Sequence, residues 1–368
     1  MASPRAPPEL MDDTIADILL RLPPDEPAVL VRASLVCKAW RRIISDPAFL
    51  RRYRRFHPTP PLLGFFNEFY GATPEPRFVP TTAASPFSRA AFDCRSRAAL
   101  DCRHGRVLLQ KEMLGNFVVW DPITGDREEL PRPRISCMSY SALVLCATAR
   151  CDHRDCHGGP FIVVCLGSDE TDNPLMHACV VYSSESHAWV TQVSADLGSD
   201  YCLSAYCGTL VNDGIYHVLG LGDGILKYDM GKQNLSVIDL PDSYDKGIVL
   251  MPTEDGLLGL ASISASCLHL WSRNVNEDAI AGWVQCRVIE LQTLLPIDSP
   301  CKQASVIGFA EGVGVIFVST DVGAFTVELK SGQARKVGEP GCYMFAVPFM
   351  TFGTPGIVPD VWLFVILH

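Results

Sequence analysis

The first sixty residues carry apolar side chains at the spacing of helices. Four aliphatic residues between positions 15 and 22 follow the pattern i, i+3, i+4, i+7, which places them along one stripe of a helix. They are Ile15, Ile18, Leu19 and Leu22. Asp12 or Asp13 could cap the start of this helix, and Pro23 with Pro24 would end it because proline disrupts a helix interior.

Two further helices are predicted by the same kind of pattern. Asp25 or Glu26 could cap a second helix that has Pro27 in its first turn, where the missing N–H costs nothing. Ser34 is expected to begin a third helix, with lysine and arginine on its polar face. The apolar residues are Val29, Leu30 and Ala33 on the second helix and Val36, Cys37, Trp40, Ile43 and Ile44 on the third.

Asp46 and Pro47 predict the start of another helix, because a capping side chain followed by a first-turn proline is a common helix beginning. Three or four helices this short cannot bury all of their apolar side chains among themselves. We therefore expect part of this apolar surface to face a partner.

These residues resemble the F-box family in their order and spacing. The matching residues are Leu10, the stripe from 15 to 22, Pro23 and Pro24, the run Leu35, Val36, Cys37 and Lys38, Trp40 with Arg41, and Ile44, Asp46, Pro47 and Phe49. One departure is visible, because Leu10 is followed by Met11 where the family usually has proline. The missing proline removes a rigid start of the first turn and leaves the apolar stripe intact.

The resemblance implies which partner would bind and where. In the family, the F-box binds the small Skp-type adaptor of a Skp-cullin-F-box ubiquitin ligase, and the region after it selects the protein to be ubiquitinated. In this chain the F-box is predicted over residues 9–56. Adaptor contact and F-box packing would be concentrated at Leu10, Ile15, Ile18, Leu19, Leu22, Pro23, Leu30, Val36, Cys37 and Trp40. The spacing by itself shows an amphipathic helical cluster, so a helical cap on the next domain is the alternative.

A different pattern begins after a short linker. Pro58, Pro60 and Pro61 are expected to stiffen the linker of residues 57–61. From residue 62 onward, short runs rich in Val, Ile, Leu and aromatic residues alternate with Gly, Asp, Asn and Ser turns, which predicts strands.

One unit of an apolar strand and a polar turn recurs five times in this region. In its clearest copies, Trp120 precedes Asp121 and Tyr228 precedes Asp229. The marker positions are Trp120, Tyr182, Tyr228, Trp271 and Val327, separated by 62, 46, 43 and 56 residues. These intervals are near the period of a four-stranded propeller blade.

Two leftover runs, residues 62–66 and 343–349, could pair from opposite ends of the chain to complete a sixth blade. Such closure would protect the sheet edges. The sequence therefore predicts a small all-α F-box module followed by an all-β propeller-like domain of five to six blades over residues 62–352. The layout resembles the kelch-like or F-box-associated propellers of plant F-box proteins, without the paired glycines of a strict kelch unit. An irregular array of β-sandwiches is the alternative.

The net charge of −10 is unevenly distributed along the chain. Residues 1–60 hold 10 Lys plus Arg and 7 Asp plus Glu, or +3, which leaves 21 basic and 34 acidic residues, or −13, for the remainder. An acidic large domain argues against a nucleic-acid partner, because phosphate binding depends on clustered Lys and Arg. The basic run over residues 51–55 is interpreted as a solvated helix face, with a nuclear address or an acidic partner surface as alternatives.

The two ends of the chain and its cysteines indicate where in the cell the protein is expected. Fifteen cysteines and a first segment without an apolar leader favour a reduced, intracellular location, cytoplasmic and/or nuclear. Residues 1–8 are expected to be disordered. The apolar tail of residues 353–368 is either a last strand or an unusual end of the chain. Its run over residues 361–367 is too short to cross a bilayer, which needs about 20 helical residues, so no membrane partner is expected.

One cluster has the residue types of a metal site. Its members are Cys151, His153, Cys156 and His157. Zinc favours thiolate and imidazole donors, but four donors crowded into seven residues make a tetrahedron awkward to close. The favoured interpretation is an exposed loop between blade strands, with no metal and no cofactor.

The chain lacks the Gly-x-Ser-x-Gly, phosphate-loop and His-Glu-x-x-His motifs of common enzymes. A propeller enzyme would need convergent titratable side chains at the central channel, and the sequence shows no such set. Loops near residues 169–174, 196–200, 274–280 and 294–300 are better candidates for partner contact.

The hypothesis is a non-catalytic substrate receptor, whose partners are the Skp-type adaptor, cullin through that adaptor, and an unidentified protein substrate. A non-ligase interaction scaffold built on a propeller is the alternative. Replacing Leu19 and Leu22 by lysine should prevent adaptor binding if the hypothesis is right.

Overall fold

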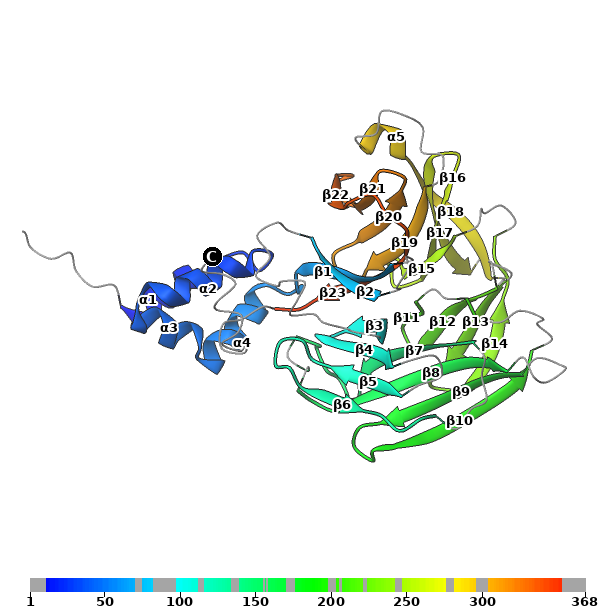
Figure 1. Cartoon of the computed structure of the whole chain (residues 1–368), viewed down its shortest axis with the longest axis horizontal. Coiled ribbons are helices and arrows are strands. Elements are labelled where there is room, and N and C mark those ends of the chain that lie inside the picture. Colours follow the sequence, from blue (N-terminus) through cyan, green and yellow to red (C-terminus); the bar gives the residue numbers. More distant parts are fainter. Residues whose placement is uncertain are drawn as a thin grey trace, which may run out of the picture.

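The computed structural model describes residues 11–69, 75–81, 97–111, 116–133, 139–154, 156, 158–169, 176–197, 203–204, 207–220, 224–241, 247–275, 281–295 and 304–352. Four helices come first, and strands make up nearly all of the rest (Figure 1). The predictions for residues 1–8, for Leu10 and for the tail at 353–368 lie outside these ranges. None of the helices within them is long and apolar enough to span a bilayer.

The helical module consists of α1 (Asp12–Leu19), α2 (Pro27–Val36), α3 (Lys38–Ile44) and α4 (Pro47–Phe56). The predicted cap of α1 by Asp12 or Asp13 is wrong, because both residues lie in the first turn and Met11 occupies the N-cap. Asp12 instead pairs with Arg42 of α3 at 2.5 Å. Acidic side chains in a first turn still favour the helix, because they complement its dipole.

The boundary between α2 and α3 also differs from the prediction. Ser34 does not begin α3; it lies inside α2, where its hydroxyl donates to the carbonyl oxygen of Val31 at 2.6 Å. Cys37 is extended, so α2 ends at Val36 and α3 begins at Lys38. Val36 and Cys37 therefore do not belong to the apolar side of α3.

Among the predicted caps, the one at Asp46 is confirmed. Its Oδ1 accepts the backbone N–H of Ala48 at 2.8 Å, and Pro47 stands in the first turn of α4. Pro27 occupies the first turn of α2 as predicted, but Glu26 at the N-cap makes no side-chain hydrogen bond to the helix.

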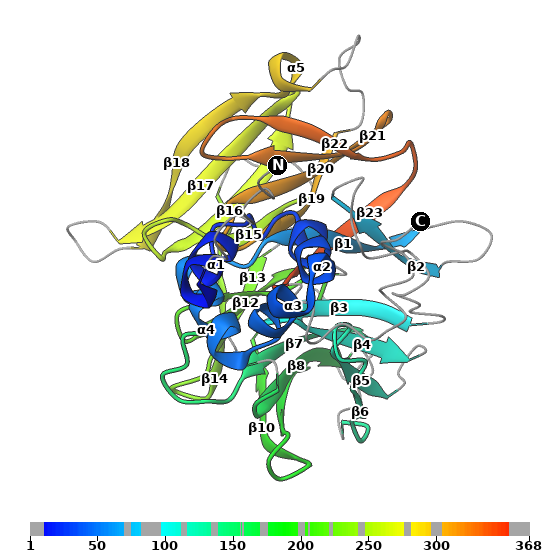
Figure 2. The same ribbon diagram turned by 90° about the vertical axis from the view of Figure 1, so that its left-hand side faces the viewer.

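One buried cluster holds the helices together and reaches the propeller. Its members are Ala16, Leu19, Leu20, Leu30, Ala33, Ile44, Phe49, Leu50, Tyr53 and Phe352. Phe352 follows the last strand of the chain, and its ring lies 6.3 Å from that of Tyr53 in an edge-on contact. The hydroxyl of Tyr53 donates to the carbonyl oxygen of Leu22 at 2.9 Å. Figure 2 shows the helices in front of the propeller, seen from their own side.

Six antiparallel sheets follow the helices. One sheet has three strands, in the order β2 (Glu75–Pro80), β1 (Leu62–Phe69), β23 (Tyr343–Met350). The next two are β3 (Arg97–Arg103), β4 (Arg106–Lys111), β5 (Phe117–Trp120), β6 (Arg127–Glu129), and then β7 (Ser139–Cys146), β8 (Phe161–Asp169), β9 (Met176–Ser183), β10 (Ala188–Asp196).

The remaining three sheets have four strands each. They are β11 (Thr209–Val211), β12 (Gly214–Leu219), β13 (Gly224–Asp229), β14 (Asn234–Ile238); then β15 (Val249–Pro252), β16 (Leu258–Ser264), β17 (Cys267–Val275), β18 (Ala281–Glu290); and β19 (Ser305–Ala310), β20 (Val315–Thr320), β21 (Gly323–Glu328), β22 (Ala334–Gly338). A single turn of helix, α5 (Leu291–Leu294), follows β18.

Buried clusters join neighbouring sheets into a closed ring. Phe66 of β1 packs with Val107 of β4 and Trp120 of β5. On the other side of the same sheet, Phe65 packs with Phe317 of β20. Four more clusters each join two consecutive sheets between β4 and β21. This cyclic order confirms the predicted propeller and gives it six blades.

The blade that closes the ring combines strands from the two ends of the domain. In the antiparallel register of β1 and β23, Phe66 lies opposite Val347 and Gly64 lies opposite Phe349. The rings of Phe66 and Phe349 are 6.0 Å apart. The predicted pairing of the leftover runs is confirmed, and it covers the edge of β1 that its local neighbour β2 leaves open.

The repeated sequence unit corresponds to the third strand of a blade. The five markers lie on β5, β9, β13, β17 and β21. In the two clearest copies, the aspartate after the marker organises the turn: Asp121 Oδ1 accepts the N–H of Ile123 at 2.8 Å, and Asp229 Oδ1 accepts that of Lys232 at 2.9 Å. An aspartate that binds backbone N–H groups ahead of it is a physical reason for the repeat.

Two tryptophans connect fourth strands to the blade before them. The indole N–H of Trp189 on β10 donates to the carbonyl oxygen of Pro131, just after β6, at 2.8 Å. The indole N–H of Trp283 on β18 donates to the backbone carbonyl oxygen of Asp239, just after β14, at 2.8 Å. These equivalent bonds tie outer strands of adjacent blades together.

Candidate functional site

The helical module leaves several large apolar side chains uncovered. They are Met11, Ile18, Leu35, Val36 and Phe56. Ile18 is 48% exposed and Val36 is 64% exposed. Most other apolar side chains of these helices are buried in the helical cluster or packed against it.

Helix α1 carries two apolar stripes where the sequence predicts one. Ala16, Leu19 and Leu20 face the helical core, and Leu19 is only 1% exposed. Ile18, one residue before Leu19, faces solvent, and Met11, the extended N-cap residue of α1, is also exposed. Ile15 lies between them in the sequence but is half-buried against the helical core, so Met11 and Ile18 form the outward stripe. The outward stripe is the part of α1 available to a partner.

The residues predicted for adaptor contact and packing separate into three groups. Exposed are Ile18, Pro23, Val36 and Cys37; half-buried are Ile15, Leu22 and Trp40; buried are Leu19 and Leu30; Leu10 lies outside the described residues. The first group can touch a partner, while Leu19 and Leu30 pack the module. Met11 and Leu35 are exposed as well, although they were not among the predicted residues.

Two ion pairs on the surface of the module connect its helices. Arg52 of α4 pairs with Asp17 of α1 at 2.9 Å, and Arg42 of α3 pairs with Asp12. Both pairs are exposed, so each contributes at most about 1 kcal/mol. In the basic run, Arg51, Arg52 and Arg55 are exposed as predicted for a solvated face, whereas Arg54 is buried.

The junction between α4 and the propeller is a packed contact. Arg54 and Phe352 line a small cavity there together with Pro60 of the linker. His57 Nε2 lies 2.8 Å from the carbonyl oxygen of Leu20, and its ring is 4.7 Å from that of Tyr53. Burial raises the pKa of Tyr53, and the Asp25 carboxylate adds to that effect. The junction fixes where the helical module sits on the ring.

The mouth of the central channel lies under the linker. A cavity of about 470 Å³ is lined by Pro58 and Pro60 and by inner strands of the blades. Three charged side chains converge there: Arg103 Nη1 lies 2.9 Å from Glu311 Oε2, and Arg103 Nε lies 3.4 Å from Asp101 Oδ2. The expectation that no titratable set converges at the channel is therefore wrong.

In this channel set one arginine, Arg103, pairs with two carboxylates. Asp101 Oδ2 also accepts the backbone N–H of Val144 at 2.9 Å. Burial raises the pKa of Asp101, and the positive charge of Arg103 opposes the shift. Because Arg103 is shared between two carboxylates, the set resembles a structural ion-pair network more than an acid and base held apart for catalysis.

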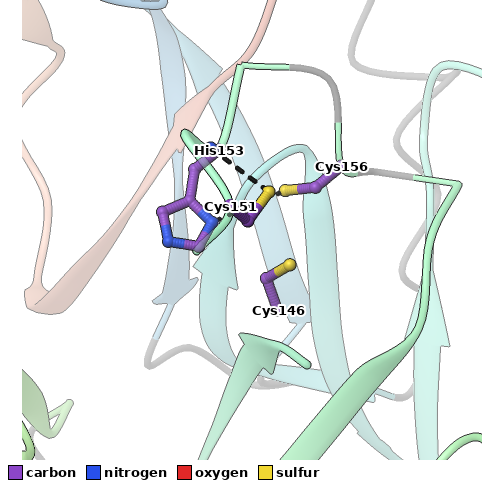
Figure 3. Close-up of side chains that lie close together, drawn as sticks. All are labelled: Cys146, Cys151, His153 and Cys156. Carbon is purple, nitrogen blue, oxygen red and sulfur yellow. Dashed lines mark hydrogen bonds between the residues drawn. The ribbon is translucent and has the colours of Figure 1, made fainter. Parts of the chain in front are cut away.

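The cysteine and histidine cluster is more compact than the sequence suggests. Cys146, Cys151, His153 and Cys156 each offer a donor atom, and all four atoms lie within 4.8 Å of one another. Figure 3 shows three side chains from the loop and Cys146 from the end of β7 beside them. Cys146 was missed because it stands five residues before the predicted group, and the predicted His157 lies outside the described residues.

The combination of F-box-like helices and a closed six-bladed ring defines the class of an F-box protein with a β-propeller. Residues 12–56 match the F-box-like family. Residues 98–355 match the family described as F-box protein AT5G49610-like, beta-propeller. Since the second match covers more than half of the 368 residues, the chain belongs to this family of plant F-box β-propeller proteins.

Individual relatives are more distant. The F-box protein At5g03970 of Arabidopsis thaliana is 26% identical over 281 residues, which cover 71% of this chain and 64% of that protein. This chain thus spans less than two thirds of that relative's length. Among solved structures, the match in a nidogen/laminin complex has a TM-score of 0.44 and 10% identity, covering 78% of this chain and 98% of that one. The WD40 domain of SCAP from fission yeast has a TM-score of 0.38 and 14% identity, covering 67% and 57%.

Proposed function

We propose that this protein is the substrate-recognition subunit of a Skp-cullin-F-box ubiquitin ligase. Its F-box helices dock on the Skp-type adaptor, which links it to cullin, and its propeller holds the protein to be ubiquitinated. The observation that carries the proposal is the uncovered apolar surface of Met11, Ile18, Leu35 and Val36 on a module whose other large apolar side chains, apart from Phe56 at the end of α4, are buried or half-buried.

This surface would contribute measurably to association. Fully burying one large apolar side chain contributes roughly 1.5 to 3 kcal/mol. Because Ile18 is 48% exposed and Val36 is 64% exposed, covering what remains of both would contribute about 2 to 3 kcal/mol, which corresponds to at least about tenfold in affinity. The helices that present them are held on the ring through Tyr53 and Phe352, so adaptor binding would also set the direction of the propeller.

The propeller is proposed to bind substrate without catalysing a reaction. The charged set at the channel mouth is ion-paired, and the linker prolines cover that mouth on the side of the helices. The net charge of −13 over residues 61–368 favours a substrate with a basic surface. Most of the loops predicted for partner contact lie outside the described residues, at 170–175, 198–200, 276–280 and 296–300.

Cytoplasm and nucleus are the proposed locations, because fifteen cysteines fit a reduced compartment. The acidic propeller supports a protein partner over nucleic acid.

The test replaces Ile18 and Val36 by lysine in the full chain and measures binding to a recombinant Skp-type adaptor. Affinity should fall at least about tenfold from the lost apolar contacts, and further because the lysine charges would have to be buried. Both residues are exposed, so the helical fold and the melting temperature should be preserved. Leu19 is unsuitable for this purpose because it is buried, and a lysine there would unfold the module.

The matched control replaces Val284 and Val288 by lysine. Both are about as exposed as Ile18, and they lie on β18 of the propeller. Adaptor affinity should be unchanged in this control. If the native chain does not bind the adaptor, or if Ile18→Lys with Val36→Lys binds as well as the native chain, the ligase proposal is wrong and the non-ligase scaffold is favoured.

A further inference from the structure

Four metal-donor side chains meet where β7 passes into the loop before β8. Cys146 is the last residue of β7, and Cys151, His153 and Cys156 lie in the loop of residues 147–160 (Figure 3). The spacing is Cys-x4-Cys-x-His-x2-Cys. Cys146 approaches from the strand while the others come from the loop, so the donors reach one point from two directions. The crowding expected for donors along one short run is thereby avoided.

The distances are close to those of a tetrahedral zinc site. Zn–S bonds of about 2.3 Å and Zn–N bonds of about 2.0 Å place neighbouring donors roughly 3.5 to 3.8 Å apart. Cys156 Sγ lies 3.8 Å from His153 Nδ1, and the widest separation among the four donors is 4.8 Å. A contraction of about 1 Å at the widest edge would therefore complete the tetrahedron.

The loop already holds hydrogen bonds of the kind that support metal-bound thiolates. The backbone N–H of His153 points to Cys151 Sγ at 3.4 Å. Such a bond to sulfur stabilises negative charge on it. His153 itself has a positive φ of 56°, an uncommon conformation for a residue other than glycine, which turns the loop back within two residues of Cys151.

Side chains from the neighbouring blade brace the cluster. Arg106 of β4 is 4% exposed, and its Nη2 donates to the carbonyl oxygen of Cys156 at 2.8 Å and also to that of Gly159. Its guanidinium is within electrostatic range of Cys146 and Cys156. Three thiolates and one neutral imidazole around Zn²⁺ carry a net charge of −1, so a buried arginine at this position offsets the charge of the site.

The imidazole ring of His153 is supported by a second histidine. It stacks on the ring of His104, in the turn between β3 and β4, with centroids 4.2 Å apart and planes at 19°. A ligand ring fixed in this way loses little freedom when a metal binds. The cluster thus has four donors, a charge partner and a support for the histidine.

We propose that Cys146, Cys151, His153 and Cys156 bind one structural Zn²⁺ ion. Four protein donors fill a tetrahedral coordination shell, so the ion would leave no open position for catalysis. Binding releases the thiol protons of the three cysteines to solvent, and no oxidant or reductant takes part.

The ion would stabilise the loop next to the F-box junction. His153, Arg154 and Cys156 line the same small cavity as Arg54 of α4 and Phe352. The loop has no regular secondary structure within its described residues, so a metal that ties residues 151–156 to the end of β7 would fix its shape. The zinc site would therefore stabilise the junction between α4 and the propeller. It is separate from the exposed apolar residues proposed to bind the adaptor.

The first experiment measures zinc in the purified full chain by mass spectrometry of the metal, after dialysis under reducing conditions. About one zinc per chain is expected. In Cys146→Ser and Cys151→Ser, zinc should fall below about one fifth of that amount. The control Cys286→Ser removes an exposed cysteine on β18 and should keep the native zinc content.

A second measurement keeps the test valid if a variant misfolds. Native apo protein titrated with Co²⁺ should develop the visible absorption of tetrahedral Co²⁺ and a thiolate-to-metal charge-transfer band, and Zn²⁺ should abolish both. Zinc binding should also raise the melting temperature of the native chain and protect residues 147–160 from protease.

The ligand set itself is tested by comparing two variants. His157→Ala should retain zinc, while His153→Ala should lose it. Loss in His157→Ala with retention in Cys146→Ser would overturn the assignment. A native chain without bound zinc, without the Co²⁺ spectrum, or with a disulfide among these cysteines under reducing conditions would overturn the proposal. Adaptor binding is measured separately, so either proposal can fail alone.

Discussion

The helical module and the propeller are both built from short apolar segments, and they differ in how completely those segments are covered. Among the described residues, five large apolar side chains are exposed in the helices: Met11, Ile18, Leu35, Val36 and Phe56. Six are exposed in the much longer propeller: Val190, Val237, Leu257, Val284, Val288 and Met344.

The difference in exposed apolar side chains arises because the propeller closes into a ring and the helical module does not. Each propeller sheet has a neighbour on both sides, because the six clusters run round the ring and return to β1 and β23. A helix of eight residues such as α1 can turn one stripe to its neighbours and has a second face with nothing to cover it. The ring therefore covers its own apolar segments, whereas the helices leave five large apolar side chains uncovered.

The largest effect is expected from a substitution that opens the ring. Phe349 of β23 is fully buried against Phe66 and Phe78, with ring centroids 6.0 Å from each. Phe349→Ala should lower the free energy of unfolding of the propeller by about 3 to 5 kcal/mol, because it leaves a cavity in the closing blade. Urea unfolding followed by tryptophan fluorescence measures this loss.

The control for this prediction is Met344→Ala on the same strand. Met344 is exposed, so its loss should change the free energy of unfolding by less than about 0.5 kcal/mol. Equal effects of the two substitutions would show that the closing blade is not what holds the ring together.

A smaller effect is expected at the contact between the two regions. Phe352 leaves the end of β23 to pack in the helical core against Tyr53. Phe352→Ala should destabilise the junction by about 1 to 3 kcal/mol and speed proteolysis at the linker of residues 57–61. The affinity for the adaptor should change little, since the outward stripe of α1 is untouched.

Phe56→Ala is the matched control, because Phe56 is exposed near the end of the same module. It should leave the rate of linker cleavage unchanged. If Phe352→Ala also leaves the rate of linker cleavage unchanged, the phenyl group of Phe352 does not couple the helical module to the propeller.

The smallest effect concerns one helix cap. Asp46→Ala removes the acceptor for the Ala48 N–H and should destabilise the helical module by about 1 kcal/mol. Asp46→Asn should restore most of that loss, because asparagine caps nearly as well. Thermal unfolding of the helices, followed through Trp40, distinguishes these variants, and equal melting temperatures would mean that the cap contributes nothing.

The features that could be predicted from the sequence depend on local patterns or on the need of sheet edges for hydrogen-bonding partners. Asp46 and Pro47 define a helix start by themselves, and the aspartate after Trp120 defines a turn. The pairing of β1 with β23 was predictable because the two strands stand outside the repeated units, at opposite ends of the domain, and an open sheet edge is unfavourable; the second partner of β1, β2, was not predicted.

Features that depend on direction or on distant contacts were not predictable. Adjacent residues Ile18 and Leu19 fall on opposite sides of α1, and which side is inward depends on the packing of α3 against it. Asp101 and Glu311 meet at the channel only because the ring closes between them. Cys146 joins the cluster because β7 ends beside its own loop, which the spacing alone does not reveal.

The central claim is that a second polypeptide covers the outward faces of α1 and the end of α2. Hydrogen exchange of the full chain, with and without the Skp-type adaptor, tests it directly. The amides of Asp12–Leu19 and those at the end of α2 should exchange at least about tenfold more slowly in the complex, while β18 exchanges at its free rate. Unchanged exchange in both helices, or protection confined to the propeller strands, would contradict the account.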